Sequence, residues 1–254
     1  MLPILNLGPL ALPVSPLLLL ASVWIGLELT ERHAPRYQSN PDLLYRLTLV
    51  ALIAGLVGAR LGYAARAPQA FLASPLSLLA PQPHMLDPWS GFLAAGLAAL
   101  IYGQRRQLPL AHTLDALTTL LAVVAVGLGL AHWASGDAFG APTRLPWAIF
   151  LWGELRHPTQ VYETLAAVLI AAAVWPGGRI ARLSEDQGAP GARFWAFIAL
   201  SAAARLFLEA FRGDSLLWFG GIRQAQVIAW AVLALALGQI GACLRSRILN
   251  AGPK

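Results

Sequence analysis

Residues 116–131 read ALTTLLAVVAVGLGLA and contain no charged side chain. They form the centre of a longer apolar stretch, 109–134, and about 20 predominantly apolar residues are enough to cross the hydrocarbon core of a bilayer. The composition of the whole chain agrees, because 57% of the 254 residues are hydrophobic, 12% are charged, and the mean hydropathy is +0.62. We therefore expect a polytopic integral membrane protein.

Seven apolar stretches of this kind are expected to form transmembrane helices. They cover residues 10–29, 42–66, 89–103, 109–134, 157–175, 193–212 and 223–244. The connections between them are mostly brief and rich in Pro, Gly and Arg, and none is a long polar segment. The sequence therefore predicts an all-α fold with a single membrane domain over residues 1–254 and no soluble domain.

The distribution of basic residues predicts the orientation of the chain, because cytoplasmic loops accumulate Lys and Arg. With the N-terminus outside, ten basic residues fall in the cytoplasmic segments and five in the outer segments. This favours an outer N-terminus and a cytoplasmic C-terminus. The pI near 10.2 is then explained by topology and by affinity for anionic lipid, and no nucleic-acid partner is expected. The first apolar stretch lacks a basic n-region, so we expect a retained helix.

Cysteine and histidine usage argues against a metal site. Cys243 is the only cysteine, which excludes an intrachain disulfide and a cysteine-based metal cage. It falls near the predicted cytoplasmic end of the last helix, where it is expected to be a small buried apolar residue. The histidines do not show the spacing of a zinc site. We therefore expect no metal and no cofactor.

Charged residues inside the predicted helices mark candidate functional positions, because the bilayer penalises them. Arg60 lies near the outer end of the second stretch, either as a side chain that snorkels to the interface or as part of a site. Arg205 and Glu209 are four residues apart and share one helix face. They form either a self-neutralising pair or part of an anion site. Arg212 and Asp214 follow at the same end, and several guanidinium groups together bind phosphate well.

A dense polar segment stands at the mouth of the fifth apolar stretch. Residues 156–163 read Arg-His-Pro-Thr-Gln-Val-Tyr-Glu. Groups that carry protons or bind anions are expensive at the entrance to a membrane, so this segment is a candidate site. The outer loop before it, 131–148, is rich in aromatic, Gly and Pro residues, which taken alone indicates interfacial anchoring and turns.

Together these segments resemble the prolipoprotein diacylglyceryl transferase family, integral membrane enzymes that attach diacylglycerol to the lipobox cysteine of bacterial prolipoproteins. The most specific match is 157–163, HPTQVYE, against the family's His-Pro-Ser/Thr-Gln-Leu-Tyr-Glu. Residues 205–212 are similar to its Arg-x-x-x-Glu-Phe-Phe-Arg. Residues 135–140 and 146–148 are similar to its Asn-Gly-Glu-x-Trp-Gly and Pro-Trp-Ala. Further similar segments are 8–12, 58–63, 114–115 and 224–226.

The chain departs from the family pattern at several polar positions. Gly129 and His132 stand where the family's Gly-Arg-x-Gly-Asn-Phe signature has an Arg and an Asn, and Asp137 replaces a Glu. Ser15 aligns best with a Tyr of the family, and Ser90 falls near the His of its His-Gly-Gly motif.

The resemblance implies a reaction and its partners. A lipobox thiol attacks the glyceryl carbon of phosphatidylglycerol, glycerol phosphate leaves, and no cofactor takes part. Because a free thiol has a pKa of about 8.5, a base or a cationic environment must supply the thiolate. The expected partners are phosphatidylglycerol, prolipoprotein signal peptides with a lipobox cysteine, and membrane lipid. The expected location is the bacterial cytoplasmic membrane, with the active site facing the outer leaflet.

Site residues follow from the resemblance and from their chemistry. Arg205 is expected to hold the phosphate while Glu209 fixes its guanidinium fork. His132 is either a base or a hydrogen-bonding substitute, with His157 and His84 as the other outer histidines. Asp137 or Glu163 would orient a histidine or pair with an arginine. The candidate catalytic residues are Arg205, Glu209, His132 and Asp137. The candidate substrate-binding residues are Arg60, Gly140, Arg156, His157, Gln160, Tyr162 and Glu163.

Two other functions stay open on the sequence alone. A degenerate paralogue would bind anionic lipid without turning it over, which the residues at positions 15, 90 and 129 favour. A transporter would use Arg60, Arg205 and Glu209 to line a pathway, although no internal repeat is apparent.

Overall fold

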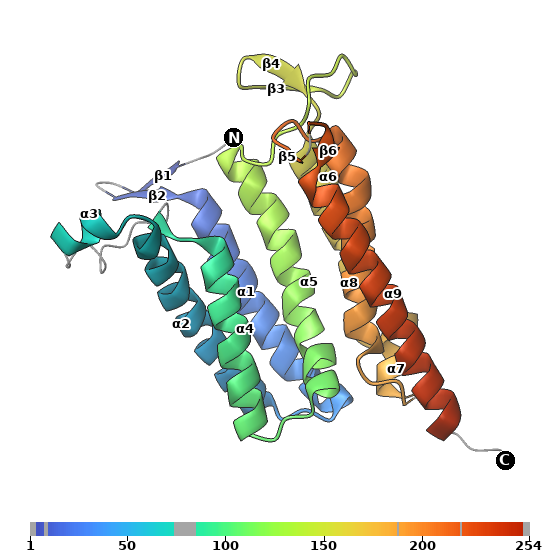
Figure 1. Ribbon diagram of the computed structural model, residues 1–254. Coiled ribbons are helices and arrows are strands. Elements are labelled where there is room, and N and C mark those ends of the chain that lie inside the picture. The colour runs from blue at the N-terminus through green and yellow to red at the C-terminus, as the bar shows by residue number, and fades with distance from the viewer. Residues whose placement is uncertain (1–3, 8–9, 74–84, 187, 219, 251–254) are drawn as a thin grey trace. The chain divides into compact units, whose positions relative to one another are not determined.

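The computed structural model describes residues 4–7, 10–73, 85–186, 188–218 and 220–250, which are mostly helical (Figure 1). Each of the seven predicted stretches corresponds to a helix, although most bounds differ by a few residues. These helices are α1 (Val14–His33), α2 (Pro41–Arg66), α4 (Pro88–Arg105), α5 (Leu110–Ser135), α6 (Thr159–Ala173), α8 (Ala192–Leu208) and α9 (Gln224–Asn250). His84 and the first two residues of the similar segment 8–12 lie outside the described residues.

Five helical segments in the described part of the chain are long and apolar enough to cross a membrane. They are Val14–Tyr37, Pro41–Arg66, Leu110–Ser135, Ala192–Phe211 and Gln224–Ile248. Helix α6 is apolar but spans only 15 residues, and α4 is not among the five. The number of seven membrane crossings and the outer N-terminus therefore stay predictions.

Three short antiparallel hairpins accompany the helices, which the expectation of an all-α fold did not include. They are β1 (Ile4–Leu7) with β2 (Leu10–Pro13), β3 (Ile149–Leu151) with β4 (Glu154–Arg156), and β5 (Leu217–Trp218) with β6 (Ile222–Arg223). Strands of two to four residues are too short to show the alternating pattern of a strand. One boundary was consequently wrong, because the first apolar stretch was expected to be helical from residue 10.

The chain divides into two compact units, Ser39–Thr113 and Met1–Gln38 with Leu114–Lys254, and each is described by itself. The single domain over 1–254 stays a prediction. In the smaller unit, α2 packs against α4 through small residues. A Cβ at Gly58 would overlap the Cβ of Ala94, and one at Gly91 would lie 3.0 Å from the Cβ of Ala59. Small residues let helix backbones approach closely, which is the usual basis of helix packing in membranes.

The start of α4 is fixed by a capping interaction that also involves the end of α2. Asp87 accepts hydrogen bonds from the backbone N–H (2.9 Å) and the hydroxyl (2.5 Å) of Ser90. These donors, together with the guanidinium of Arg66 at 2.7 Å, hold the pKa of Asp87 below its usual value. Arg60 donates to the carbonyl of Met85 at 3.1 Å. The last turns of α2, which carry the similar segment 58–63, are thus bonded to the capped start of α4.

In the larger unit, helices α5, α6, α8 and α9 lie side by side (Figure 1). A small apolar core of Ala122, Val174 and Phe197 joins α5 and α8 to the end of α6. Higher up, a Cβ at Gly129 would lie 2.5 Å from the Oγ1 and 3.0 Å from the Cα of Thr164. Helices α5 and α6 therefore touch at a position where only a glycine fits.

A buried arginine ties together the opposite end of this unit. Arg193 is fully buried and donates to the carbonyl of Val174 (2.7 Å), the carbonyl of Asp115 (2.6 Å) and the hydroxyl of Thr119 (2.9 Å). Its guanidinium lies 4.8 Å from the ring centre of Tyr37. The carboxylate of Asp115 caps α8, because it accepts from the N–H groups of Gly191 and Phe194. One side chain thereby connects the ends of four helical segments.

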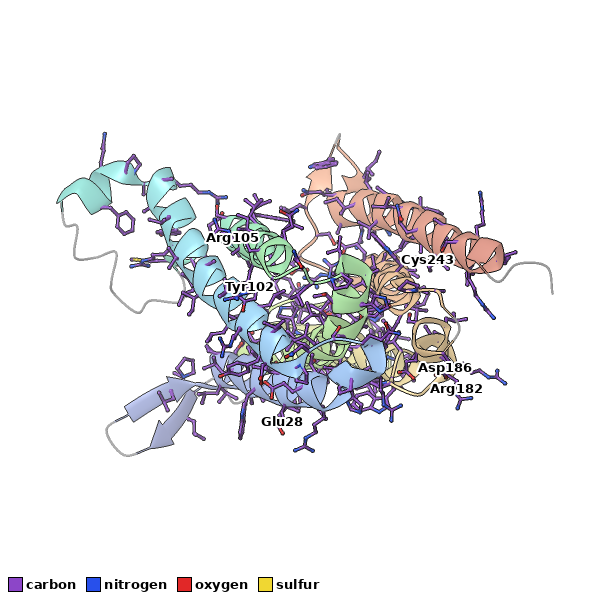
Figure 2. The ribbon with its side chains drawn as sticks, turned by 90° about the horizontal axis from the view of Figure 1, so that it is seen from below. Glu28, Tyr102, Arg105, Arg182, Asp186 and Cys243 are labelled. Carbon is purple, nitrogen blue, oxygen red and sulfur yellow. The ribbon has the colours of Figure 1, made fainter. Side chains whose placement is uncertain are left out.

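Figure 2 shows the molecule from below and labels Arg182, Asp186 and Cys243. The first belongs to α7 (Arg179–Glu185), and the second follows it directly. Cys243 lies on α9 and is only half-buried, so the expectation of a buried cysteine was wrong. The reason is that α9 exposes most of its length, with several large apolar side chains on its surface.

Candidate functional site

One carboxylate joins three helices of the larger unit. Glu163 lies in the second turn of α6, where its Oε1 accepts from Arg205 Nη1 at 3.2 Å and from Arg212 Nη1 at 2.5 Å. Its Oε2 lies 3.3 Å from the Nδ1 of His132 at the end of α5. We call His132, Glu163, Arg205, Glu209 and Arg212 the charge cluster. Burial makes such ion pairs stronger than they would be in water.

The arginines of the charge cluster share one helix face with a buried glutamate. Arg205, Glu209 and Arg212 follow one another at spacings of four and three residues, across α8 and the 3-10 helix η4 (Glu209–Phe211). Glu209 is 1% exposed, and its Oε2 lies 3.0 Å from Arg205 Nη2 and 4.0 Å from Arg212 Nε. The shorter distance is an ion pair without the alignment of a hydrogen bond. The Arg205 side chain is 40% exposed, so it is the arginine that a ligand reaches most easily.

Two further residues support the arginines from outside the charge cluster. Asp214 accepts two hydrogen bonds from Arg212, at 2.8 Å from Nε and 2.6 Å from Nη2. Arg223, at the end of β6, donates to the backbone carbonyls of Glu209 and Arg212. Together these contacts fix the turn between α8 and α9. Arg205 and Arg212 thus pair with three carboxylates, those of Glu163, Glu209 and Asp214. Arg223 forms no ion pair among the described residues. The site therefore has no large excess of positive charge, and an anion would bind to specific donors.

The charge cluster stands at one end of a cavity of about 220 Å³ between α5, α6 and α8. His132, Glu163 and Arg205 line its polar end. Further along the same helices the lining is apolar, with Leu128, Ile170, Phe197 and several alanines. A cavity with charged groups at one end and an apolar interior suits an amphiphile that has a charged head and a hydrocarbon chain.

Polar residues at the start of α6 hold the loop that follows α5. The Thr159 hydroxyl donates to the Ala138 carbonyl at 2.6 Å, and the Gln160 side-chain amide donates to the Asp137 carbonyl at 2.9 Å. Both Thr159 and Gln160 are fully buried. Because the loop chain also pairs with the turn after α8 at Gly140, the two segments close over the same end of the helices.

Comparison with known proteins agrees with this arrangement. The model of the family described as prolipoprotein diacylglyceryl transferase matches residues 3–241. The chain belongs to this family. Proteins named phosphatidylglycerol–prolipoprotein diacylglyceryl transferase from *Synechococcus elongatus*, *Nostoc* sp. and *Bifidobacterium adolescentis* are similar to it.

The three relatives resemble the chain over most of its length. The *Synechococcus* protein is 28% identical over 253 residues, covering 93% of this chain and 84% of its own. The *Nostoc* protein is 27% identical, covering 91% and 85%. The *Bifidobacterium* protein is 28% identical, covering 91% and 75%. The family resemblance seen in the motifs is therefore confirmed, at an identity that leaves room for differences in the site.

The chain departs from the pattern of the diacylglyceryl transferase family at several positions, and the structure shows where each of these residues lies. Gly129 sits against Thr164, so no longer side chain fits there without moving α6. His132 supplies one partner of Glu163. Ser90 caps α4 by bonding to Asp87, and Ser15 lies in the first turn of α1. Of these positions, only His132 joins the charge cluster.

His157 and Tyr162 form an aromatic support next to the charge cluster. The ring of His157 lies 5.3 Å from that of Phe211 and 6.3 Å from that of Tyr162. The Tyr162 hydroxyl accepts from the indole of Trp147 at 2.7 Å. A Cβ at Gly140 would overlap the His157 carbonyl, so glycine allows the loop to pass this close. Their predicted substrate-binding roles stay predictions.

Two predicted site residues have contacts outside the charge cluster. Arg156 donates to the carbonyls of Leu151 and Gly140 at 3.2 Å each and to Glu154 at 2.8 Å, and it lies 5.0 Å from the ring centre of Phe139. It therefore binds the loop and its hairpin together.

The carboxylate of Asp137 is exposed and forms no ion pair among the described residues, although its backbone carbonyl receives the bond from Gln160. Arg60 belongs to the smaller unit, so its relation to the charge cluster stays a prediction. The catalytic role of Asp137 likewise stays a prediction.

Sequence reasoning did not assign Arg212, Asp214 and Arg223 to the site. A signal for Arg212 was present, because a residue seven positions after Arg205 returns to the same helix face. Arg223 had no such signal, since its bonds to the turn after α8 arise only when α9 packs against α8. Its position just before α9 resembles an ordinary interfacial arginine.

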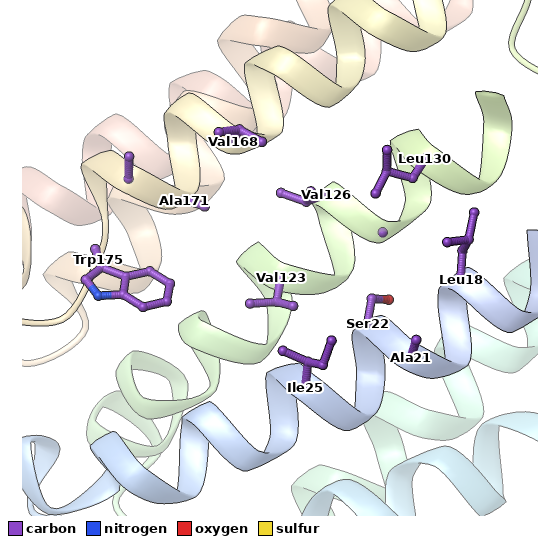
Figure 3. A pocket seen from close by; sticks show the side chains of 12 residues that line it. Leu18, Ala21, Ser22, Ile25, Val123, Val126, Leu130, Val168, Ala171 and Trp175 are labelled. Atoms are coloured by element: carbon purple, nitrogen blue, oxygen red, sulfur yellow. The ribbon is translucent and has the colours of Figure 1, made fainter. Parts of the chain in front are cut away.

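A second and larger cavity of about 700 Å³ lies between α1, α5 and α6 (Figure 3). Leu18 and Ile25 line it from α1, Val126 from α5, and Val168 and Trp175 from the segment around α6. No charged residue lines this cavity. Among its lining residues there is no carboxylate, histidine, lysine or arginine, in contrast to the polar end of the smaller cavity.

Proposed function

We propose that this protein is a phosphatidylglycerol:prolipoprotein diacylglyceryl transferase. It would move diacylglycerol from phosphatidylglycerol to the lipobox cysteine thiol of a prolipoprotein and release glycerol phosphate. The observation that carries the proposal is the pair Arg205 and Arg212, held by Glu163 at the polar end of a cavity with an apolar interior. The relatives named for this reaction support it.

The arginines account for the step that needs the most stabilisation. When the thiolate attacks the glyceryl carbon, a C–S bond forms and the C–O bond to phosphate breaks, so negative charge grows on the leaving phosphate. Fixed cations beside that phosphate lower the barrier. Arg205 is the accessible donor, and Glu209 and Glu163 fix the direction of its guanidinium. Arg212, which Asp214 holds with two hydrogen bonds, donates to the same Glu163 oxygen as Arg205.

The location follows from the direction of the helices. The charge cluster lies where α5 ends and α6 begins. In the predicted topology with an outer N-terminus, this end of the helices faces the outer leaflet of a bacterial cytoplasmic membrane. There a secreted prolipoprotein, still anchored by its signal peptide, can present its lipobox cysteine.

A reconstituted assay tests the proposal. The purified protein, in vesicles that contain phosphatidylglycerol, should add one diacylglyceryl group to a lipobox peptide and release an equal amount of glycerol phosphate. Arg205→Ala should abolish both signals. Arg182→Ala changes an exposed arginine of α7 and should leave them intact. Absence of turnover by the wild-type protein would contradict the proposal.

A second candidate is a protein that binds anionic lipid without turning it over. The specific observation in its favour is that three carboxylates pair with only two arginines, Arg205 and Arg212, while Gly129 adds no further cation. This candidate predicts that phosphatidylglycerol binds and that binding needs Arg205, while no lipidated peptide forms. The assay above separates the two functions when lipid binding is measured alongside.

A further inference from the structure

One ring nitrogen of His132 is available at the polar end of the 220 Å³ cavity. The Nδ1 of this histidine lies 3.3 Å from Glu163 Oε2, and His132, Glu163 and Arg205 all line the cavity. In the described part of the chain, the structure gives no hydrogen bond to its Nε2. The pair thus has the form of an imidazole oriented by a carboxylate, beside the cation that would hold the phosphate.

We propose that His132 is the base that removes the proton from the lipobox thiol, with Glu163 as its positioning residue. This inference rests on the proposed transferase function. A carboxylate that accepts from Nδ1–H leaves Nε2 as the proton acceptor and stabilises the imidazolium that forms. Such a histidine can act at neutral pH, where a thiol alone is mostly protonated.

Other groups at this end of the larger unit are less suited to the task. His157 is wedged against Tyr162 and Phe211 and does not line the cavity. Glu163 and Glu209 each pair with guanidinium groups, so protonating either carboxylate would weaken ion pairs that hold the arginines. Protonation of His132 breaks no ion pair. The imidazolium keeps its contact with Glu163 and adds an attraction between opposite charges.

The charges that face His132 come from two other helices. Glu163 of α6 brings a negative charge to His132, Arg205 of α8 brings a positive charge, and Arg212 shares one Glu163 oxygen with Arg205. A phosphate bound to Arg205 would offset that positive charge.

The proposed step balances without any further reactant. The thiol proton moves to His132 Nε2 as the sulfur attacks the glyceryl carbon. The C–S bond forms, the C–O bond breaks, and the bonding electrons leave with the phosphate oxygen of glycerol phosphate. The proton then passes from the imidazolium to the departing phosphate, which restores the neutral histidine.

The experiment compares the wild-type protein with His132→Gln in the vesicle assay over a range of pH. Glutamine keeps a hydrogen-bonding group but cannot titrate, and it is not the asparagine that the family pattern has at this position. We expect kcat to fall on the order of 10²- to 10⁴-fold near neutral pH, with phosphatidylglycerol binding retained. The deficit should shrink as the pH approaches the thiol pKa of about 8.5, where thiolate forms without a base. The wild-type rate should also fall on the acidic side as imidazole becomes protonated, and the variant should lack that imidazole limb.

Two controls make the result decisive. His112→Gln changes a histidine at the other end of α5 and should leave the rate and its pH profile unchanged. Added imidazole should restore part of the activity of His132→Ala, since it can occupy the space of the missing ring. A His132→Gln variant with unchanged kcat, or with a deficit that is the same at every pH, would overturn the inference and leave the transferase function standing. Failure of the wild-type protein to turn over would instead remove the function itself.

Discussion

The single carboxylate of Glu163 determines how the site is built. It binds two arginines through one oxygen and a histidine through the other, and these partners come from three different helical segments. Buried ion pairs of this kind are sensitive to the loss of one partner, because the remaining charges stay behind without compensation. The site therefore depends on the charge of this residue as well as on its shape.

Replacing Glu163 by glutamine tests this dependence. Glu163→Gln keeps the size of the side chain but removes the negative charge that Arg205, Arg212 and His132 share. We expect diacylglyceryl transfer to fall at least about tenfold, because the arginines lose their alignment and the histidine loses its acceptor. The measurement is the initial rate in phosphatidylglycerol vesicles. Glu28→Gln, at an exposed position on α1 (Figure 2), should have no effect, and equal rates for both variants would contradict the expectation.

At the scale of the elements, helix ends carry most of the polar interactions. The carboxylate of Asp87 caps the start of α4 and binds Ser90 and Arg66. The carboxylate of Asp115, a residue of α5, caps the start of α8. The first N–H groups of a helix have no partners within the helix, so a carboxylate there satisfies them. These caps fix the first turns of α4 and α8, at the ends of their apolar segments.

The cap at Asp87 predicts a dependence of stability on pH. Its pKa in the folded protein is held below the ordinary value of 3.8, chiefly by the Ser90 hydroxyl and N–H. A depressed carboxyl pKa stabilises the fold above the ordinary value, and this stabilisation is lost as the pH falls through the folded pKa. Thermal unfolding in detergent should therefore show a Tm that decreases in this acidic range.

A serine variant isolates the contribution of this cap. Ser90→Ala removes the hydroxyl donor, so the Asp87 pKa should move back toward 3.8 and the acid dependence of Tm should become weaker. Ser246→Ala removes an exposed hydroxyl on α9 that bonds only to the Cys243 carbonyl among the described residues, and it should leave the dependence unchanged. The same acid dependence in both variants would show that Asp87 does not cause it.

At the scale of the whole molecule, the residues that stabilise the larger unit and the residues of its candidate site lie at different ends of the helices. One end of its helices carries the charge cluster, and the other end is joined by the fully buried Arg193. That arginine bonds to backbone carbonyls of two helical segments and stacks on Tyr37. Its donors bind three acceptors in the interior, and their partner is a guanidinium that is itself fully buried, which indicates a role in folding.

Removing this buried anchor should therefore destabilise the protein. Arg193→Leu leaves the carbonyls of Val174 and Asp115 and the Thr119 hydroxyl without their donor. We expect a loss of about 3–5 kcal/mol of unfolding free energy, seen as a much lower Tm in detergent. Arg182→Leu on α7 is the matched control, because its guanidinium is exposed. A Tm that falls equally for both variants, or for neither, would contradict the assignment of Arg193 as an anchor.

The sequence predicted the apolar helices and the principal candidates for the site. It placed Arg205 and Glu209 on one helix face, because their spacing follows the local geometry of a helix. It did not predict the short hairpins. The substrate-binding role of Arg156 stays a prediction, and the contacts of this side chain in the structure are with the loop and its hairpin. A guanidinium that binds phosphate and one that binds backbone carbonyls look the same in a sequence.

The sequence by itself determined that this chain is built from apolar helices and belongs with the transferases, since composition and the HPTQVYE segment require no knowledge of packing. Only the tertiary structure decided that Glu163 meets His132 and Arg212, which lie 31 and 49 residues away along the chain. The physical reason is that helical periodicity acts over a few residues. Which residues of two helices meet depends on how their side chains fit together. At the contact between α5 and α6, for example, Gly129 leaves room for the side chain of Thr164.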